Sequence, residues 1–181
     1  MNIRRKLILR HVAEILENQD VVAPPVKIES IVKAHGVTIV HVDESDENSG
    51  FLYREPKTGK VVLGVNSNHA PVRQRFTLAH ELGHLLLHSS QPVHVDGKGM
   101  GFQVHLRNEL SGEGTKRSEV EANLFAAELL MPRDMLRLEL AGVQTLMTLD
   151  DEGLIAELAE KYEVSQMALS IRLSQLRWFF Q

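Results

Sequence analysis

Residues 76–87, which read FTLAHELGHLLL, decide the fold of this chain. Apolar side chains would occupy nearly every side of a helix through this stretch, so the pattern predicts a buried helix rather than a surface helix with one polar face. Pro71 suits the first turn of a helix, and the pattern ends near His88. The sequence therefore predicts a central, buried helix over residues 71–88.

Three polar side chains, His80, Glu81 and His84, interrupt this apolar stretch in the pattern H-E-x-x-H. The four-residue spacing puts both imidazoles on one face of a helix, one turn apart, where they can bind the same metal ion. Glu81 lies beside them, about 100° round the helix. A buried, unpaired carboxylate costs several kcal/mol, which a divalent cation would offset. The pattern predicts a metal site with Glu81 as general base; the alternative is a core helix with hydrogen-bonded histidines.

A catalytic zinc ion needs a third protein ligand, and the helix predicted from Ser118 to about Met131 offers candidates. On that helix Glu119 shares a face with small alanines that permit close packing, while Glu121 lies about 200° away. We predict that Glu119 is the third ligand and that Asn123 supports a ligand by a hydrogen bond. Glu121 is expected to be a capping or surface group. The alternative for Glu119 is a first-turn charge that interacts with the helix dipole.

Two further positions lead to predictions: Gly83 within the motif and His88 just after it. Gly83 destabilises a helix by about 1 kcal/mol relative to alanine, so its presence predicts that another backbone approaches closely there. His88 lies one turn after His84, but three helical histidines at this spacing do not converge easily on a tetrahedral ion. We therefore expect His88 to support the site or to lie at the surface.

The composition excludes several classes of protein. With 181 residues, 43% of them hydrophobic, the chain can bury one core. The absence of cysteine excludes disulfides, iron–sulfur clusters, thiolate zinc fingers and cysteine nucleophiles, so any metal must be held by histidine and carboxylate. No run of 18 apolar residues occurs, and Arg10 interrupts the apolar stretch near the start. We expect a cytoplasmic protein with no membrane segment.

The rest of the chain predicts an α+β fold with a small sheet of three to four strands, antiparallel or mixed. A turn over residues 56–59 predicts a hairpin, because proline and glycine stand where turn geometry favours them. Residues 89–117 form a long glycine-rich connection that contains a strand-like segment. The predicted helices are 4–18 and 26–35, and the predicted strands are 37–42, 51–54, 60–65 and 102–106.

Residues 154–162 and 165–178 predict two short helices spaced like a helix-turn-helix. We therefore divide the chain into a domain over residues 1–148 and a small helical extension, 149–181, packed on it. From residue 150 onward the tail has six acidic side chains and three basic ones, and the whole chain has a net charge of −4. This balance opposes direct DNA binding, whose affinity depends on phosphate contacts.

Residues 75–88 and 119–132 together resemble the ImmA/IrrE family of metallopeptidases, and the resemblance extends over most of the chain. It implies a zincin-like fold and a zinc-dependent endopeptidase. It places the metal ligands at His80, His84 and Glu119 and the base at Glu81. Members of this family typically cleave repressors of the Xre helix-turn-helix type, so the resemblance implies that class of protein substrate.

The expected chemistry follows from these residues. A zinc ion, or Mn²⁺ or Fe²⁺ in its place, would activate water and polarise the scissile carbonyl, while Glu81 carries a proton from the water to the leaving amine. A further donor for the oxyanion is expected, with four candidates left open. An extended peptide is expected to pair with a strand over 101–107 or 60–65. The candidate oxyanion donors are Tyr53, His94, His105 and Tyr162.

Two other functions compete with the peptidase hypothesis. One is a non-catalytic antirepressor or toxin–antitoxin accessory that binds a helix-turn-helix protein through the same fold. The other is a DNA-binding regulator, which the charge of the tail opposes. The complete set of ligands and base favours the peptidase.

Overall fold

The computed structural model describes residues 4–45, 48–88, 93–97, 112–141 and 152–177. Its elements confirm a mixed α+β fold, because runs of helices and one small mixed sheet make up the described chain. The helices are α1 (Arg5–Asn18), α2 (Ile28–Ala34), α3 (Pro71–Leu87), α4 (Gly112–Leu130), α5 (Arg133–Ala141), α6 (Glu152–Tyr162) and α7 (Gln166–Arg177). The strands are β1 (Val37–Val42), β2 (Asn48–Arg54), β3 (Val61–Asn66) and β4 (Val93–Gly97).

The four described strands form one sheet in the order β1-β3-β2-β4. β1 runs parallel to β3, whereas β2 is antiparallel to both β3 and β4, so the sheet is mixed as predicted. β2 and β3 form the predicted hairpin. β3 lies inside the sheet with a partner on each side, so the expectation that an extended peptide could pair with residues 60–65 is wrong. The other strand proposed for that role, 101–107, lies outside the described residues.

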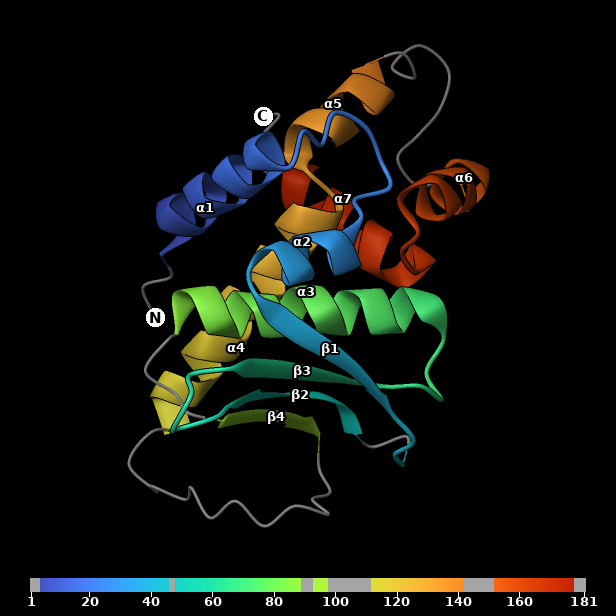
Figure 1. Cartoon of the computed structure of the whole chain (residues 1–181). Helices are drawn as coiled ribbons and strands as arrows, with labels where there is room; N and C mark the ends of the chain where they lie inside the picture. The colour runs from blue at the N-terminus through green and yellow to red at the C-terminus, as the bar shows by residue number, and fades with distance from the viewer. Residues whose placement is uncertain (1–3, 46–47, 89–92, 98–111, 142–151, 178–181) are drawn as a thin grey trace.

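Helix α3 forms the middle layer of the molecule. Figure 1 shows the sheet on one side of α3 and helices α1, α2, α5, α6 and α7 on the other. Every residue from 77 to 85 is buried, which confirms the predicted buried helix, and Pro71 occupies its first turn as expected. Leu78 and Leu82 belong to the same core as Leu63 of β3. The histidines and the glutamate of the motif therefore lie on the most buried element of the fold.

Helix α4 packs against α3 at Gly83, as the sequence predicted. A Cβ atom built at Gly83 would lie 3.1 Å from Cδ1 of Phe125 and 3.2 Å from Cα of Ala122. The prediction that α4 begins at Ser118 is wrong, because the helix begins six residues earlier, at Gly112. Glycines at 112 and 114 lower helix propensity, but extending a helix that packing already stabilises costs much less than nucleating one.

Helices α6 and α7 correspond to the two predicted C-terminal helices. Residues 163–165 join them, and the backbone N–H of Ala168 donates to Ser165 Oγ at the start of α7. The boundary proposed near residue 148 falls in residues 142–151, outside the described part, so the division into 1–148 and 149–181 stays a prediction. Among the described residues, no helix has both the length and the apolar character needed to cross a bilayer.

Candidate metal centre

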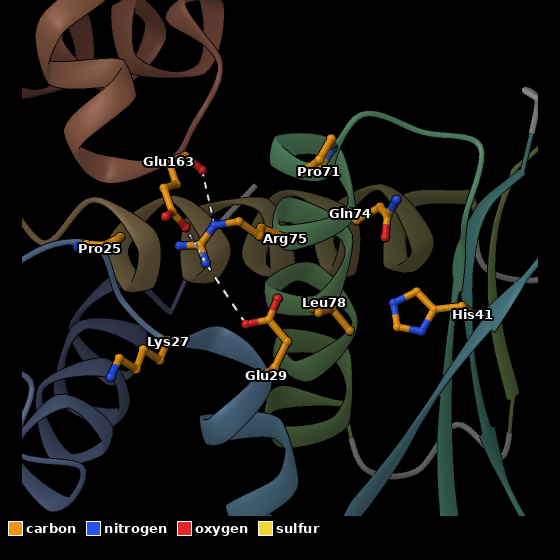
Figure 2. A pocket seen from close by; sticks show the side chains of 9 residues that line it. All are labelled: Pro25, Lys27, Glu29, His41, Pro71, Gln74, Arg75, Leu78 and Glu163. Atoms are coloured by element: carbon orange, nitrogen blue, oxygen red, sulfur yellow. Dashed lines mark hydrogen bonds and ion pairs between the residues drawn. The ribbon is translucent and has the colours of Figure 1, made fainter.

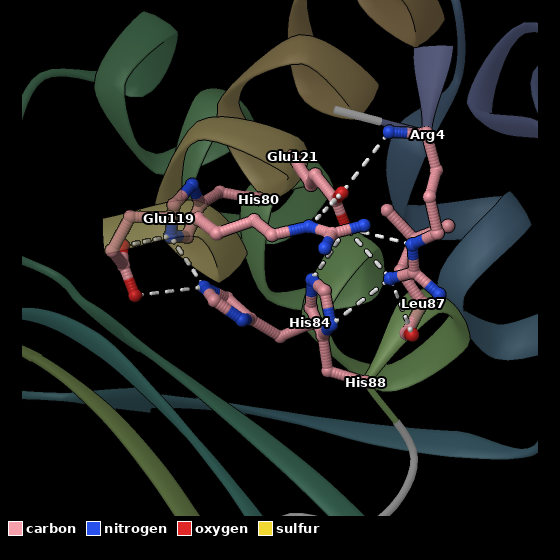
Figure 3. Close-up of polar contacts among 8 residues, drawn as sticks. Arg4, His80, His84, Leu87, His88, Glu119 and Glu121 are labelled. Carbon is pink, nitrogen blue, oxygen red and sulfur yellow. Dashed lines mark hydrogen bonds and ion pairs between the residues drawn. The ribbon is translucent and has the colours of Figure 1, made fainter. Parts of the chain in front are cut away.

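His80 and His84 face each other from consecutive turns of α3 (Figure 3). Their Nε2 atoms lie 3.0 Å apart, and the ring centroids are 4.7 Å apart. Both side chains are buried, with exposed fractions of 4% and 2%. The predicted helical spacing therefore brings the two imidazole nitrogens to one point, with little room for movement.

Glu119 comes to the same point from α4. Its Oε2 lies 3.3 Å from His80 Nε2, and its Oε1 lies 3.3 Å from His84 Nε2. Among the described residues, these three form the group of side chains that could hold a metal ion, with ligand atoms all within 4.8 Å of one another. The Glu119 side chain keeps 33% exposure, so the cluster borders the surface on the side of α4.

The distances within this cluster fit a metal ion. Nitrogen and oxygen ligands bind zinc at about 2.0–2.1 Å, which in a tetrahedral site puts neighbouring ligand atoms about 3.4 Å apart. The two Nε2 atoms are 3.0 Å apart, and each lies 3.3 Å from a different oxygen of Glu119, so the nitrogens and the carboxylate are spaced close to this value. Two imidazoles and one carboxylate are also a ligand set that occurs in catalytic zinc sites. The roles of His80, His84 and Glu119 as ligands stay predictions.

Asn123 lies one turn beyond Glu119 on α4 and contacts the other nitrogen of His80. The distance from His80 Nδ1 to Asn123 Oδ1 is 3.1 Å. Because an amide oxygen only accepts hydrogen bonds, Nδ1 carries the proton and donates it, and the lone pair of a neutral His80 is then on Nε2. This is the contact expected of a residue that supports a metal ligand.

Glu81 is fully buried on α3, with 0% exposure. Its place directly after His80 in a buried helix fits the predicted general base, and that role stays a prediction.

The side chains of two of the four candidates for the oxyanion donor lie in the described structure. Tyr53 is partly exposed on β2, whereas Tyr162 is fully buried at the end of α6, where a substrate would not reach it. His105 and the side chain of His94 lie outside the described structure.

The expectation that Glu121 is a capping or surface group is wrong, because its carboxylate has 0% exposure. Arg4 Nη2 donates to Oε2 at 2.6 Å, the backbone N–H of Arg4 donates to Oε1 at 3.1 Å, and Arg117 Nε donates to Oε1 at 2.9 Å. Burial alone would raise the pKa of Glu121, but the hydrogen bonds from Arg4 and Arg117 outweigh it and lower the pKa to about 2. Glu121 is therefore a buried, charged anchor.

His88, at the end of α3, lies against this anchor rather than among the three candidate ligands. Its Nδ1 is 3.3 Å from Arg4 Nη2, and its Nε2 is 3.7 Å from Glu121 Oε2. Burial, followed by the charge of His84, lowers the pKa of His88, although the carboxylate of Glu121 acts in the opposite direction. His88 thus contacts Arg4 and Glu121, and its supporting role stays a prediction.

A separate cavity of about 420 Å³ lies between α2, β1, α3 and the turn after α6 (Figure 2). Arg75 crosses it: Nη1 pairs with Glu163 at 3.1 Å, Nε donates to the Glu163 backbone oxygen at 3.1 Å, and Nη2 donates to the Val26 backbone oxygen at 2.8 Å. None of the candidate metal ligands lines this cavity. Through these contacts Arg75 joins α3 to the turn at Glu163 and to the segment at Val26.

Comparison with known proteins places this site in a family. The profile of the IrrE N-terminal-like domain, a peptidase M78 family, matches residues 32–174. The metallopeptidase ImmA of Bacillus subtilis (strain 168) is 25% identical over 164 residues, which cover 84% of this chain and 85% of ImmA. The radiation response metalloprotease IrrE of Deinococcus radiodurans is 31% identical over 116 residues, which cover 63% of this chain and 31% of IrrE.

A solved structure supports the fold. The structure of a Mycobacterium tuberculosis transcriptional regulator superposes with a TM-score of 0.59 at 19% identity, covering 92% of this chain and 46% of that one. At this identity the likeness concerns the fold alone. The family match includes all of α3 and all of α4, the two helices that carry His80, His84 and Glu119. The chain belongs to the IrrE N-terminal-like peptidase family, together with the metallopeptidases ImmA and IrrE.

Proposed function

We propose that this protein is a zinc-dependent endopeptidase with a zincin-like fold, in which His80, His84 and Glu119 hold the ion. The observation that carries the proposal is the convergence of two imidazole Nε2 atoms, 3.0 Å apart, with the carboxylate of Glu119, whose two oxygens each lie 3.3 Å from one of them, on the helix that also carries the buried Glu81. The family of metallopeptidases to which the chain belongs supports it. Mn²⁺ and Fe²⁺ accept the same ligands and are the other candidate ions.

A bound metal ion would supply Lewis acidity, which activates water and polarises the scissile carbonyl. Glu81 accepts the proton of the attacking water on its carboxylate and returns it to the nitrogen of the leaving amine. Asn123 holds the proton of His80 on Nδ1, so that Nε2 keeps its lone pair for the cluster. No side chain of this set needs to act as a nucleophile.

The substrate class that we propose is a regulatory protein, a repressor of the Xre helix-turn-helix type. The support is the resemblance of both motifs to the ImmA/IrrE family and the relation to ImmA and IrrE, which are named as metalloproteases. In the same proposal, residues 1–148 form the peptidase domain and residues 149–181 a helical extension packed on it. The acidic charge of this extension argues against DNA as its partner.

The first test is the metal content of the purified protein. We expect about one zinc ion per chain, lost in Glu119→Ala because the site loses one of three ligands. Glu157→Ala is a matched control, since Glu157 is an exposed glutamate on α6. Zinc retained in Glu119→Ala would contradict the ligand assignment. Wild-type protein that takes up no zinc would contradict the proposed function.

The second test separates a peptidase from a non-catalytic binding protein. Purified zinc-loaded protein is mixed with an Xre-type repressor, and cleavage is followed by mass spectrometry. Glu81→Gln should keep the zinc but lose cleavage, because the amide cannot accept the proton of water. Cleavage by Glu81→Gln at the wild-type rate would refute Glu81 as the base. An effect on repressor function without cleavage in either protein would favour the antirepressor alternative.

A further inference from the structure

Next to the candidate metal ligands lies a second group of charged residues, Arg4, Arg117 and Glu121, which we call the Glu121 cluster. We infer that the Glu121 cluster positions Glu119, by fixing the rotation of α4 about its axis and its position along α3. The inference rests on the proposed function and extends it to residues outside the ligand set. It also explains why a carboxylate is buried here at all.

The first step of the argument is how strongly Glu121 is held. Four hydrogen bonds reach its carboxylate, at 2.6, 3.1 and 3.1 Å from Arg4 and at 2.9 Å from Arg117. Charge-assisted hydrogen bonds are about twice as strong as neutral ones, and several of them on one carboxylate fix its position in space. The backbone of α4 at residue 121 is held with it.

The second step is where Arg4 is attached. Besides Glu121, its Nη2 donates to the backbone oxygen of Leu87 at 3.2 Å, at the C-terminal end of α3. Figure 3 shows Arg4 between this end of α3 and Glu121. Arg4 thus joins the helix that carries His80 and His84 to the helix that carries Glu119. It makes this link from the segment just before α1.

The third step concerns the two sides of α4. Residues 119 and 121 project from a helix about 200° apart, so Glu119 and Glu121 lie on nearly opposite sides of the same turn. Glu119 faces the two histidines, and its side chain is one-third exposed, so packing alone does not fix it. Because Glu121 is held at a second point, beside His88 at the end of α3, α4 cannot turn, and each oxygen of Glu119 stays 3.3 Å from one imidazole.

The fourth step is the cost of the arrangement. Burying a carboxylate is expensive, and an apolar side chain would fill the same space at lower cost. Apolar packing tolerates sliding and rotation, whereas a hydrogen-bonded ionic cluster has one geometry. A buried carboxylate, held by two arginines whose side chains are 39% and 40% exposed and lying two residues from a proposed ligand, is thus suited to holding a geometry. The interpretation concerns position only and assigns no proton transfer to Glu121.

The test uses Arg4→Gln, with Arg10→Gln as matched control. Arg10 also pairs with a glutamate, Glu14, at 2.8 Å, but at the surface of α1. Three quantities are measured: zinc affinity by competition with a chelator, the visible absorption of the Co²⁺-substituted protein, and the melting temperature of the metal-free protein. We expect Arg4→Gln to weaken zinc binding by about tenfold and to alter the Co²⁺ spectrum, as loss of a supporting contact does. Arg10→Gln should change neither the zinc affinity nor the Co²⁺ spectrum.

A double-mutant cycle separates positioning from general loosening of the fold. Glu119→Ala loses its zinc during purification but keeps the two histidine ligands, and its weaker zinc affinity is measured by titration. If Arg4 acts through Glu119, then Arg4→Gln should not weaken this residual affinity further. An equal weakening in both backgrounds, or no weakening in the wild-type background, would overturn the inference. Should Arg4→Gln fail to fold because Glu121 has lost a partner, the variant Arg4→Gln/Glu121→Gln removes that charge, and the same cycle is run on it.

The inference and the proposed function fail in different ways. Wild-type protein that binds no zinc refutes both. Zinc that depends on Glu119 but not on the Glu121 cluster refutes the inference alone and leaves the endopeptidase proposal standing.

Discussion

The hydrogen bond between His80 Nδ1 and Asn123 Oδ1, 3.1 Å long, joins the two helices of the proposed site through a single pair of atoms. We predict that Asn123→Ala weakens zinc binding by about 10-fold to 100-fold, because His80 then loses the partner that selects its tautomer and ring orientation. Competition with a chelator measures this change. Asn18→Ala, at an exposed position at the end of α1, is the control and should bind zinc as the wild type does. Equal affinity of Asn123→Ala and wild type would contradict the role of Asn123.

The lowered pKa of Glu121 leads to a prediction about how the stability of the protein depends on pH. Its pKa lies at about 2 in the folded chain against an ordinary 4.5. A carboxyl whose pKa folding lowers stabilises the fold above its ordinary pKa, and this contribution is lost as the pH falls through the folded value. We predict that Glu121→Gln lowers the free energy of unfolding of the metal-free protein by about 2 kcal/mol near neutral pH. The gap to wild type should close between about pH 4.5 and pH 2 in urea unfolding; a constant gap would contradict the assignment.

The same residues show which parts of the candidate site could be predicted from the sequence. His80, Glu81 and His84 are found because their spacing is local, and the helical wheel then selects Glu119 over Glu121. Arg117 could have been paired with Glu121, because side chains four residues apart on a helix are neighbours. Arg4 leaves no such signal, since 117 residues separate it from Glu121. Because the contact with Arg4 could not be predicted, a glutamate in the first turns of a helix was expected to be a charged surface residue.

At the scale of elements, the approach of α3 to α4 at Gly83 decides the geometry of the site. Alanine at this position would gain about 1 kcal/mol of helix propensity. Its Cβ would stand 3.2 Å from a backbone atom of Ala122, which does not move as a flexible side chain does. Overpacking of this kind costs about 1–3 kcal/mol, so it outweighs the gain. We predict that Gly83→Ala lowers stability by about 1 kcal/mol and weakens zinc binding, because α4 carries Glu119.

Thermal unfolding and chelator competition on Gly83→Ala test this prediction. Gly153→Ala is the matched control, because Gly153 is an exposed glycine in α6 and alanine there should stabilise the helix. If Gly83→Ala is more stable than wild type and binds zinc equally well, the close approach of the two helices does not set the position of Glu119.

Elements were predictable where their signal is local. The buried α3 follows from its continuous apolar pattern, and the hairpin of β2 and β3 follows from the turn between them. The start of α4 was missed because a helix extends through poor helix formers once packing holds the rest of it. β4 was missed because residues 93–97 lie in a glycine-rich stretch, and their pairing with β2 depends on a strand some 40 residues earlier.

At the scale of the whole molecule, two buried arginines attach α6 and α7 to the helices of the proposed site. Arg172 of α7 pairs with Glu128 of α4 at 2.5 Å and donates to the backbone oxygen of Met131 at 3.1 Å. Arg75 of α3 holds Glu163, in the turn between α6 and α7, at 3.1 Å. The C-terminal helices therefore hold both α3 and α4, and side chains from all four helices belong to one core. From this we expect the described helices and sheet to unfold as one cooperative unit.

Replacement of Arg172 by methionine tests that expectation. Breaking a buried ion pair from one side costs about 3 kcal/mol or more, because the remaining charge stays buried. Glu128 keeps the longer contacts with Arg133, from the backbone N–H at 3.3 Å and from Nε at 3.4 Å. We predict that Arg172→Met lowers the free energy of unfolding by about 3 kcal/mol while circular dichroism and limited proteolysis still report a single transition. Arg137→Met, which removes an exposed arginine of α5, should have almost no effect. If Arg172→Met instead releases α6 and α7 in a separate early transition, these helices form a unit of their own, and the expectation of one cooperative unit is wrong.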